Sequence, residues 1–350
     1  MLNLRNWPLY TPRKMLRSSW VKGLLAATLA SASQSTFAGQ VNNQTAGCPP
    51  AIPVTVMLAD GTAVIHLTPT AFDARVHGHS ANIVAFDEDL TPKRIVLVLD
   101  ASRNVNAEAW RIETSVARFL VDGSPPQVRF ALIILNAEAA PLDFTTERET
   151  LKSRLAALVT SRPANPKLSE DIYGGLISAL KLLGTRQFGD TMFAFLGGAD
   201  DSHRAAVGAV QRAFVEQGVR LFGLILGQES LYGFYMTAPG PGPREVPFDP
   251  DTNELGHLAV ETGGLLAVEN TRMQQMTYHL TDERLTQIEV TAHRFYSQMV
   301  TPYRIQIATD APTKPESWSI ALSEAIKLQA PAARVLFPHQ LASCALGNTR

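Results

Sequence analysis

The sequence predicts an α/β protein with a doubly wound, mostly parallel sheet, to which the two ends of the chain add a small β-sandwich-like region. Three observations lead to this prediction. From Lys93 onward, short and continuously apolar runs alternate with helical patterns, as in a parallel sheet buried on both faces. Residues 54–92 and 300–350 show strand signals instead. With 45% hydrophobic and 18% charged residues, the chain has enough apolar material for a sizeable core.

The first 38 residues have the pattern of a secretory signal peptide. They carry five basic residues and no acid, then an apolar stretch over 23–32 and a small-residue region ending at Ala38. We expect cleavage after Ala38 or Ala32, which would give an exported protein of the periplasm, the cell envelope or the extracellular space, without a transmembrane span. The alternative is an uncleaved anchor, but the apolar stretch is about half of the roughly 20 residues that a spanning helix needs.

The charge of the mature chain argues against a nucleic-acid partner. Removing the five basic residues of 1–38 from the 31 Lys and Arg leaves 26, against 32 Asp and Glu. A mildly acidic chain without a basic run lacks the electrostatic surface that binds phosphates.

The two cysteines, Cys48 and Cys344, lie near the two ends of the mature chain. Export permits disulfide formation, so we expect a bond between them. The alternatives are two unrelated thiols, or a lipid anchor on Cys48.

The flanks of the chain precede and follow the α/β region. We expect a linker over 39–53, a β-rich flank over 54–92, the α/β domain over 93–299 and a second β-rich flank over 300–350. In the first flank, Asp60-Gly61 between two apolar runs predicts a β-hairpin. Each flank is too short for a secure core of its own, so we expect the two to form one sandwich with the α/β domain inserted between them.

The elements of the α/β domain follow from apolar patterning. Continuous apolar runs predict strands over 95–99, 128–135, 192–196, 219–226 and 265–268. Apolar residues at helical spacing predict helices over 110–120, 151–158, 172–183, 207–214 and 285–299. Gly218 is suited to close the fourth helix and Thr281 to cap the start of the fifth.

The loop after the first of these strands is the candidate site, because ligands of open α/β sheets bind beyond the carboxyl ends of the strands. Its sequence is Asp100-Ala101-Ser102-Arg103-Asn104. It resembles the Asp-x-Ser-x-Ser of the von Willebrand factor A (VWA) domain, which forms part of a divalent-metal adhesion site. The resemblance implies Asp100 and Ser102 as metal ligands, with Asn104 in place of the last Ser. The simpler interpretation is that Asp100 and Ser102 cap the helix that follows.

Two further positions of the family's metal site are altered. The family has a Thr three residues before a Tyr that opens a helix, and here Glu170 stands three residues before Tyr173. The family's Asp-Gly after the next strand corresponds to Gly198, with Asp200 and Asp201 just beyond. We therefore expect a degenerate site without a cofactor, in which Asp100, Ser102, Asn104, Glu170 and Asp200 are the candidate ligands. Bound Mg²⁺ or Mn²⁺ is the alternative.

The resemblance extends over some 250 residues. The mature chain is similar to the VWFA-related proteins first grouped in acidobacteria, which carry a series of short motifs in the same order. In this chain the motifs are Thr68-Pro69-Thr70-Ala71-Phe72, Ile83-Val84-Ala85-Phe86, Thr262-Gly263-Gly264 and Phe295-Tyr296-Ser297-Gln298. The resemblance implies a secreted or envelope protein with a VWA fold.

An enzyme is not expected, because the sequence has no Gly-x-Ser-x-Gly, His-Glu-x-x-His or phosphate-loop motif. We expect an adhesion or scaffold module that binds a protein partner. Tyr232, Phe234 and Tyr235 on the loop after residue 226 are candidate partner anchors, unless they pack down on the domain. The alternative is a working Mg²⁺- or Mn²⁺-dependent adhesion domain that binds a partner's carboxylate. A remote alternative is a hydrolase that uses the acids near Glu170 and Asp200.

Overall fold

A six-stranded sheet forms the centre of the fold. The computed structural model describes residues 51–102, 105–161, 171–197, 207–226, 254–269, 280–309 and 316–341, and the backbone of 244–245. The strand order is β10-β11-β9-β8-β6-β7, and every neighbouring pair is parallel except β10 with β11. This confirms the predicted doubly wound, mostly parallel sheet. Its strands are β6 (Arg94–Asp100), β7 (Arg129–Leu135), β8 (Thr191–Leu196), β9 (Arg220–Leu226), β10 (Arg244–Glu245) and β11 (Leu265–Glu269).

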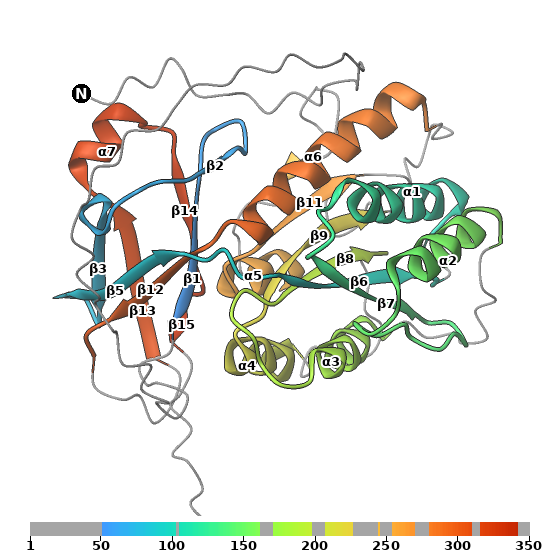
Figure 1. The fold of residues 1–350 in the computed structure, drawn as a ribbon, viewed down its shortest axis with the longest axis horizontal. Coiled ribbons are helices and arrows are strands. Elements are labelled where there is room, and N and C mark those ends of the chain that lie inside the picture. The colour runs from blue at the N-terminus through green and yellow to red at the C-terminus, as the bar shows by residue number, and fades with distance from the viewer. Residues whose placement is uncertain are drawn as a thin grey trace, which may run out of the picture. The chain divides into compact units, whose positions relative to one another are not determined.

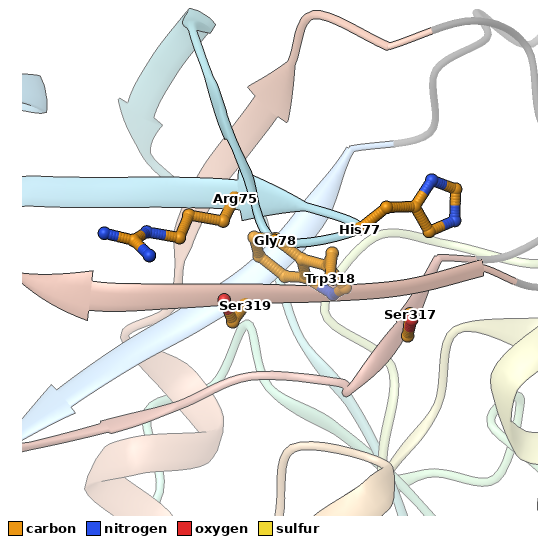
Figure 2. Close-up of a pocket in the computed structure, with 6 residues that line it drawn as sticks. All are labelled: Arg75, His77, Gly78, Ser317, Trp318 and Ser319. Carbon is orange, nitrogen blue, oxygen red and sulfur yellow. The ribbon is translucent and has the colours of Figure 1, made fainter.

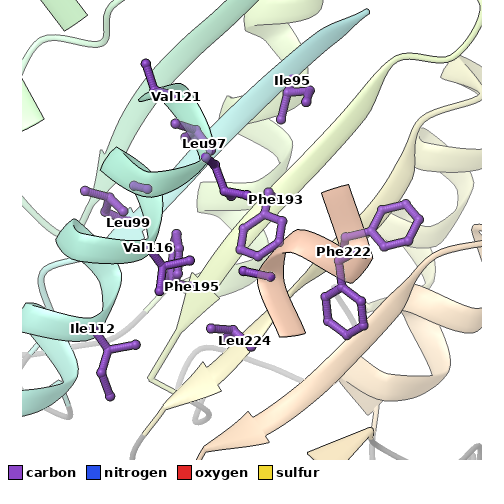
Figure 3. Close-up of a cluster of buried hydrophobic side chains, with 14 of the residues drawn as sticks. Ile95, Leu97, Leu99, Ile112, Val116, Val121, Phe193, Phe195, Phe222 and Leu224 are labelled. Atoms are coloured by element: carbon purple, nitrogen blue, oxygen red, sulfur yellow. The ribbon is translucent and has the colours of Figure 1, made fainter. Parts of the chain in front are cut away.

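In the described part of the chain, three helices cover each face of this sheet (Figure 1). One face carries α1 (Ala107–Gly123), α2 (Arg148–Thr160) and α6 (Asp282–Val300). The other carries α3 (Ile172–Leu183), α4 (Val207–Gln217) and α5 (Glu254–Glu261). Residues of β6 alternate between the two layers: Leu97 packs toward α1, and Val96 and Val98 toward the opposite helices. Figure 3 shows the first layer, in which Phe195 of β8 lies near Val116 of α1. Phe222 of β9 packs instead against Phe295 of α6, with ring centroids 6.1 Å apart.

Strands from both ends of the chain combine in two further antiparallel sheets. The first has the order β14-β1-β12-β5, with β2 paired to β1, and the second has the order β15-β13-β3-β4. Their bounds are β1 (Ile52–Met57), β2 (Ala63–Val64), β3 (Phe72–Val76), β4 (His79–Ala81), β5 (Ile83–Glu88), β12 (Tyr303–Ile307), β13 (Glu316–Leu322), β14 (Arg334–Leu336) and β15 (Gln340–Leu341). One buried cluster contains residues of both sheets, among them Val54, Phe72, Tyr303 and Trp318.

The start of the first flank lies earlier than expected. The predicted hairpin is present, since β1 pairs with β2 across a turn in which Gly61 has a φ of +82°. However, β1 begins at Ile52, inside the range expected to be a linker. Pro53, the last residue of that range, lies within the strand, in register with Arg304 of β12. Two short helices, a 3-10 turn over Pro69–Ala71 and α7 (Glu324–Gln329), were not predicted.

A buried arginine joins the parallel sheet to the first flank sheet. Arg220 of β9 donates hydrogen bonds to the hydroxyl of Thr55 on β1 (3.0 Å) and to the carbonyls of Gln298 (3.2 Å) and Met299 (2.9 Å) at the end of α6. The last carbonyls of a helix have no partner within the helix, so this side chain satisfies the end of α6 while it contacts the flank.

The Thr262-Gly263-Gly264 motif forms a second junction, at the turn between α5 and β11. Thr262 forms an isolated β-bridge with Pro338, and its hydroxyl accepts a hydrogen bond from the backbone N–H of Leu221 (3.1 Å). A Cβ atom on Gly263 would lie 2.6 Å from the backbone carbon of Phe337, and one on Gly264 would lie 1.8 Å from the carbonyl oxygen of Leu221. The motif therefore allows a close approach of backbones that no larger residue permits.

Candidate functional site

The candidate site lies where the strand order of the parallel sheet reverses. From β6 the chain moves to β7 on one side and later returns to β8 on the other side of β6. The carboxyl ends of these three strands form the upper face, defined here by residues 100–102, 135–136 and 196–197. Open α/β sheets bind their ligands at such a switch point. Asp100, the last residue of β6, therefore occupies the position where the topology favours a site.

The carboxylate of Asp100 is buried and accepts four hydrogen bonds from the protein. Its Oδ1 accepts from the backbone N–H of Ser102 (2.9 Å) and from the side-chain amide of Asn136 (2.9 Å). Its Oδ2 accepts from the hydroxyl of Ser102 (3.0 Å) and from the backbone N–H of Gly197 (2.9 Å). These donors follow β6, β7 and β8, so one carboxylate holds the ends of three strands together.

Asn136 and Gly197 have backbone features that suit this arrangement. Asn136 has a φ of +56°, a left-handed conformation that Asn tolerates better than most residues. A Cβ atom on Gly197 would lie 3.0 Å from Oδ2 of Asp100 and 3.1 Å from Oγ of Ser102. A larger residue at 197 would crowd these side chains, so glycine suits the approach of its backbone N–H to the carboxylate.

A second buried acid lies beneath the loop. Glu113 of α1 accepts a hydrogen bond at Oε2 from the backbone N–H of Asp100 (2.8 Å), and both side chains are fully buried. Sequence analysis did not identify Glu113 or Asn136 as site residues. For Glu113 a signal was present, because a charged residue three positions after Trp110 and four before Ala117 falls on the apolar face of the predicted helix.

The interpretation of Asp100 and Ser102 as a helix cap is wrong. The N-cap of α1 is Asn106, whose side chain accepts a hydrogen bond from the backbone N–H of Ala109 (2.8 Å). Asp100 instead accepts from the three strand ends, and the hydroxyl of Ser102 donates to Asp100. The helix begins at Ala107, too far along the chain for either side chain to be its cap.

Tyr173 lies at the start of α3, as the sequence predicts. Asp171 caps this helix by accepting a hydrogen bond from the backbone N–H of Gly174 (2.7 Å). The hydroxyl of Tyr173 donates to Oε2 of Glu254, the first residue of α5 (2.9 Å). Tyr173 thus links the starts of two helices on the same side of the sheet.

The remaining predicted site residues lie outside the described residues. They are the candidate ligands Asn104, Glu170 and Asp200, the loop residues Tyr232, Phe234 and Tyr235, and the cysteines Cys48 and Cys344.

The described part of the upper face does not fit a divalent metal ion. An ionised carboxylate offers about four acceptor positions, and protein donors fill four at Asp100. Mg²⁺ requires oxygen ligands in an octahedron, and the amide group of Asn136 faces the carboxylate with its nitrogen. Among the described residues, no group of three or more His, Cys, Asp or Glu side chains is placed to hold a metal.

A shallow hollow of about 220 Å³ lies on the second flank sheet, away from these residues. It is lined by Arg75, His77, Gly78, Ser317, Trp318 and Ser319. Figure 2 shows the side chains of Arg75 and His77 directed away from each other. Because its polar groups do not converge, the hollow is not a candidate binding site.

No described helix is both long and apolar enough to cross a membrane. No family model and no curated protein sequence matches the chain.

Several solved structures are similar to part of the chain. Proximal thread matrix protein 1 from the mussel byssus, with a zinc-occupied MIDAS motif, is 13% identical over 64% of this chain and 50% of its own (TM-score 0.43). The manganese-loaded TRAP protein of Plasmodium vivax is 11% identical, and the match covers 74% of this chain and 98% of the TRAP chain (TM-score 0.39). The conserved hypothetical protein BatB of Bacteroides thetaiotaomicron is 14% identical, and the match covers 59% of this chain and 98% of the BatB chain (TM-score 0.38). The chain thus spans about half the length of the mussel protein. The fold described above is assigned from the strand order of the present chain.

Proposed function

We propose that the chain is an exported, non-catalytic protein-interaction module of the VWA type, which contacts a protein partner with its upper face. The observation that carries the proposal is the placement of Asp100 and its hydrogen-bond donors at the switch point of the sheet. Such a position holds residues 100–102, 135–136 and 196–197 at the ends of rigid strands, as is typical of binding surfaces built on a scaffold. The order of basic, apolar and small residues in 1–38 supports export.

The hydrogen bonds of the upper face favour binding over catalysis. A general base needs a free acceptor within reach of its substrate. The Asp100 carboxylate has its acceptor positions filled and is buried. We therefore propose a module that presents a surface, without metal-assisted contact to a partner's carboxylate. The flank sheets form its second part, a β-sandwich-like module tied to the VWA-type domain by Arg220 and Thr262.

Site-specific photo-crosslinking tests this proposal. A photoreactive phenylalanine at position 138, an exposed position two residues after Asn136, should crosslink to a protein in envelope extracts. The same group at position 328, where Leu328 is 84% exposed on α7, serves as the matched control. Crosslinking at 138 alone, which a Tyr232→Ser/Phe234→Ser/Tyr235→Ser variant weakens, is the expected result. Equal crosslinking at both positions, or crosslinking at 328 alone, would contradict the proposal. Loss of the crosslink in EDTA would support the metal-dependent alternative instead.

A further inference from the structure

The four donors to Asp100 differ in origin. Two belong to Ser102 in the same loop, and one is the backbone N–H of Gly197. The fourth, the amide group of Asn136, is a side chain from another strand end. Asn136 is therefore the donor that can be changed without altering the Asp100 loop or the backbone that follows β8.

The orientation of the Asn136 amide follows from charge. A buried carboxylate is stable only when hydrogen bonds or a counter-ion compensate the loss of water. An amide oxygen turned toward Oδ1 of Asp100 would add repulsion, whereas the NH₂ group donates a hydrogen bond at 2.9 Å. The amide thus places partial positive charge next to the carboxylate, where a cation would otherwise compensate it.

We propose that Asn136 replaces a divalent cation at the upper face, so that Asp100 is an internal anchor for three strand ends and not a metal ligand. The shape of the upper face is then independent of Mg²⁺ and Mn²⁺. This inference concerns the same face as the proposed function, but it holds whether or not a protein partner binds there.

One substitution should restore the need for a cation. Asn136→Asp keeps the size of the side chain, and Asp tolerates the left-handed backbone at this position. The variant replaces the donor with a second carboxylate next to Oδ1 of Asp100. Two neighbouring carboxylates repel each other unless they share a proton or bind a cation. With the hydroxyl of Ser102 they provide oxygen ligands of the kind that Mg²⁺ and Mn²⁺ prefer.

Thermal melting in EDTA, MgCl₂ and MnCl₂ tests the proposal on the whole mature chain, without any partner. The wild type should melt at the same temperature in all three. Asn136→Asp should melt lower in EDTA and recover by about 5 °C at saturating metal, because a ligand that binds only the folded state stabilises it. Asn136→Gly is the matched control: it keeps the backbone conformation, loses the amide without adding a second carboxylate, and should melt lower than the wild type in EDTA.

Two results would overturn the proposal. The first is a metal-dependent rise in the melting temperature of the wild type that disappears in Asp100→Asn. The second is an Asn136→Asp variant that is folded by circular dichroism and does not respond to either metal. If Asn136→Asp does not fold, the wild type and Asn136→Gly decide the question. A metal response of the wild type contradicts the proposal, and the absence of one, with a lowered melting temperature in Asn136→Gly, supports it. A failure to find a crosslinked partner would leave these melting results unchanged.

Discussion

Arg220 is the largest of the fully buried side chains among the described residues. It donates hydrogen bonds to one hydroxyl and two carbonyls. Burial lowers the pKa of Arg220 to about 9, against a weaker opposing effect of the charge of Asp89. The guanidinium therefore stays charged at neutral pH. Its charge is compensated by the end of α6, where the helix dipole is negative. The residue thus joins β9, α6 and β1 through one side chain.

Arg220→Met should lower the free energy of unfolding by about 3 kcal/mol. The apolar side chain is of similar length, but it leaves the hydroxyl of Thr55 and the carbonyls of Gln298 and Met299 without this donor. Urea unfolding measures the change. Arg129→Met, at an exposed position of β7, is the control and should be nearly neutral. Equal stability of Arg220→Met and wild type would contradict the role assigned to Arg220.

Asp89 gives the stability of the protein a predictable dependence on pH. Burial opposes its ionisation, but hydrogen bonds from Lys93 and Thr91 outweigh burial, so the pKa of Asp89 lies below its usual value. Arg304 also contacts the carboxylate, at 3.1 Å. As the pH falls, the carboxyl of Asp89 therefore takes up its proton at a higher pH in the unfolded chain than in the folded protein. The stabilisation is present above a pH of about 4 and is lost as the pH falls below it.

The urea midpoint of the wild type should thus fall between pH 5 and pH 3. Asp89→Asn should be less stable at pH 6, and its midpoint should fall less over the acid range, because one of the acids with a lowered pKa is gone. Other acids, among them Asp60 and Glu261, also have lowered pKa values, so some dependence should remain. Parallel pH profiles for the two proteins would contradict this role of Asp89.

At the scale of elements, apolar patterning predicted the helices that bury a stripe of apolar side chains and missed the helices that do not. The spacing of Leu151, Leu155 and Leu158 predicted α2, and all three are buried. Thr281 caps α6 and Gly218 closes α4 with a φ of +62°, both as predicted. In contrast, α7 has no buried residue. Its sequence therefore lacks the apolar stripe from which a helix could have been predicted.

The candidate site was predictable only in part for the same reason. The position of Asp100 follows from the end of an apolar strand and the switch point of a parallel sheet. Its donors do not follow from local sequence. Asn136 and Gly197 lie 36 and 97 residues away, and only the strand order brings them to the carboxylate. The helix-cap interpretation was wrong because it considered only neighbours along the chain.

Gly264→Ala tests the close contact between the start of β11 and β9. The new Cβ would meet the carbonyl oxygen of Leu221 at 1.8 Å, which forces the paired backbones apart. We expect a loss of about 3 kcal/mol in urea unfolding. Gly208→Ala is the matched control, since nothing lies within 4 Å of its Cβ position on α4. It should stabilise the protein by about 0.5 kcal/mol. A neutral Gly264→Ala would contradict the structural role of the Thr-Gly-Gly motif.

At the scale of the whole molecule, strands from the two ends of the chain depend on each other. β1 pairs with β12 and β14, and β3 pairs with β13. Neither flank therefore completes a sheet alone. This pairing brings Ile52 of β1 into register with Ile305 of β12. Removal of either flank should consequently leave the other with unpaired strand edges.

A disulfide between Cys48 and Cys344 remains a prediction. Both cysteines lie a few residues beyond described flank strands, β1 and β15. Peptide mapping of the exported protein after alkylation without reduction should yield one linked pair of peptides that contains both residues. Alkylated, unlinked cysteines at both positions would contradict the bond and leave the strand pairing unaffected.

The central claim is that protein donors, and not a metal ion, hold the upper face together at Asp100. Hydrogen–deuterium exchange of the wild type in EDTA and in MgCl₂ tests it most directly, because the backbone N–H groups of Ser102 and Gly197 both donate to that carboxylate. Exchange in peptides that cover 96–102 and 191–197 should be the same in both buffers. Faster exchange of these two segments in EDTA, with 221–226 of β9 unchanged, would contradict the claim and show that a cation stabilises the upper face.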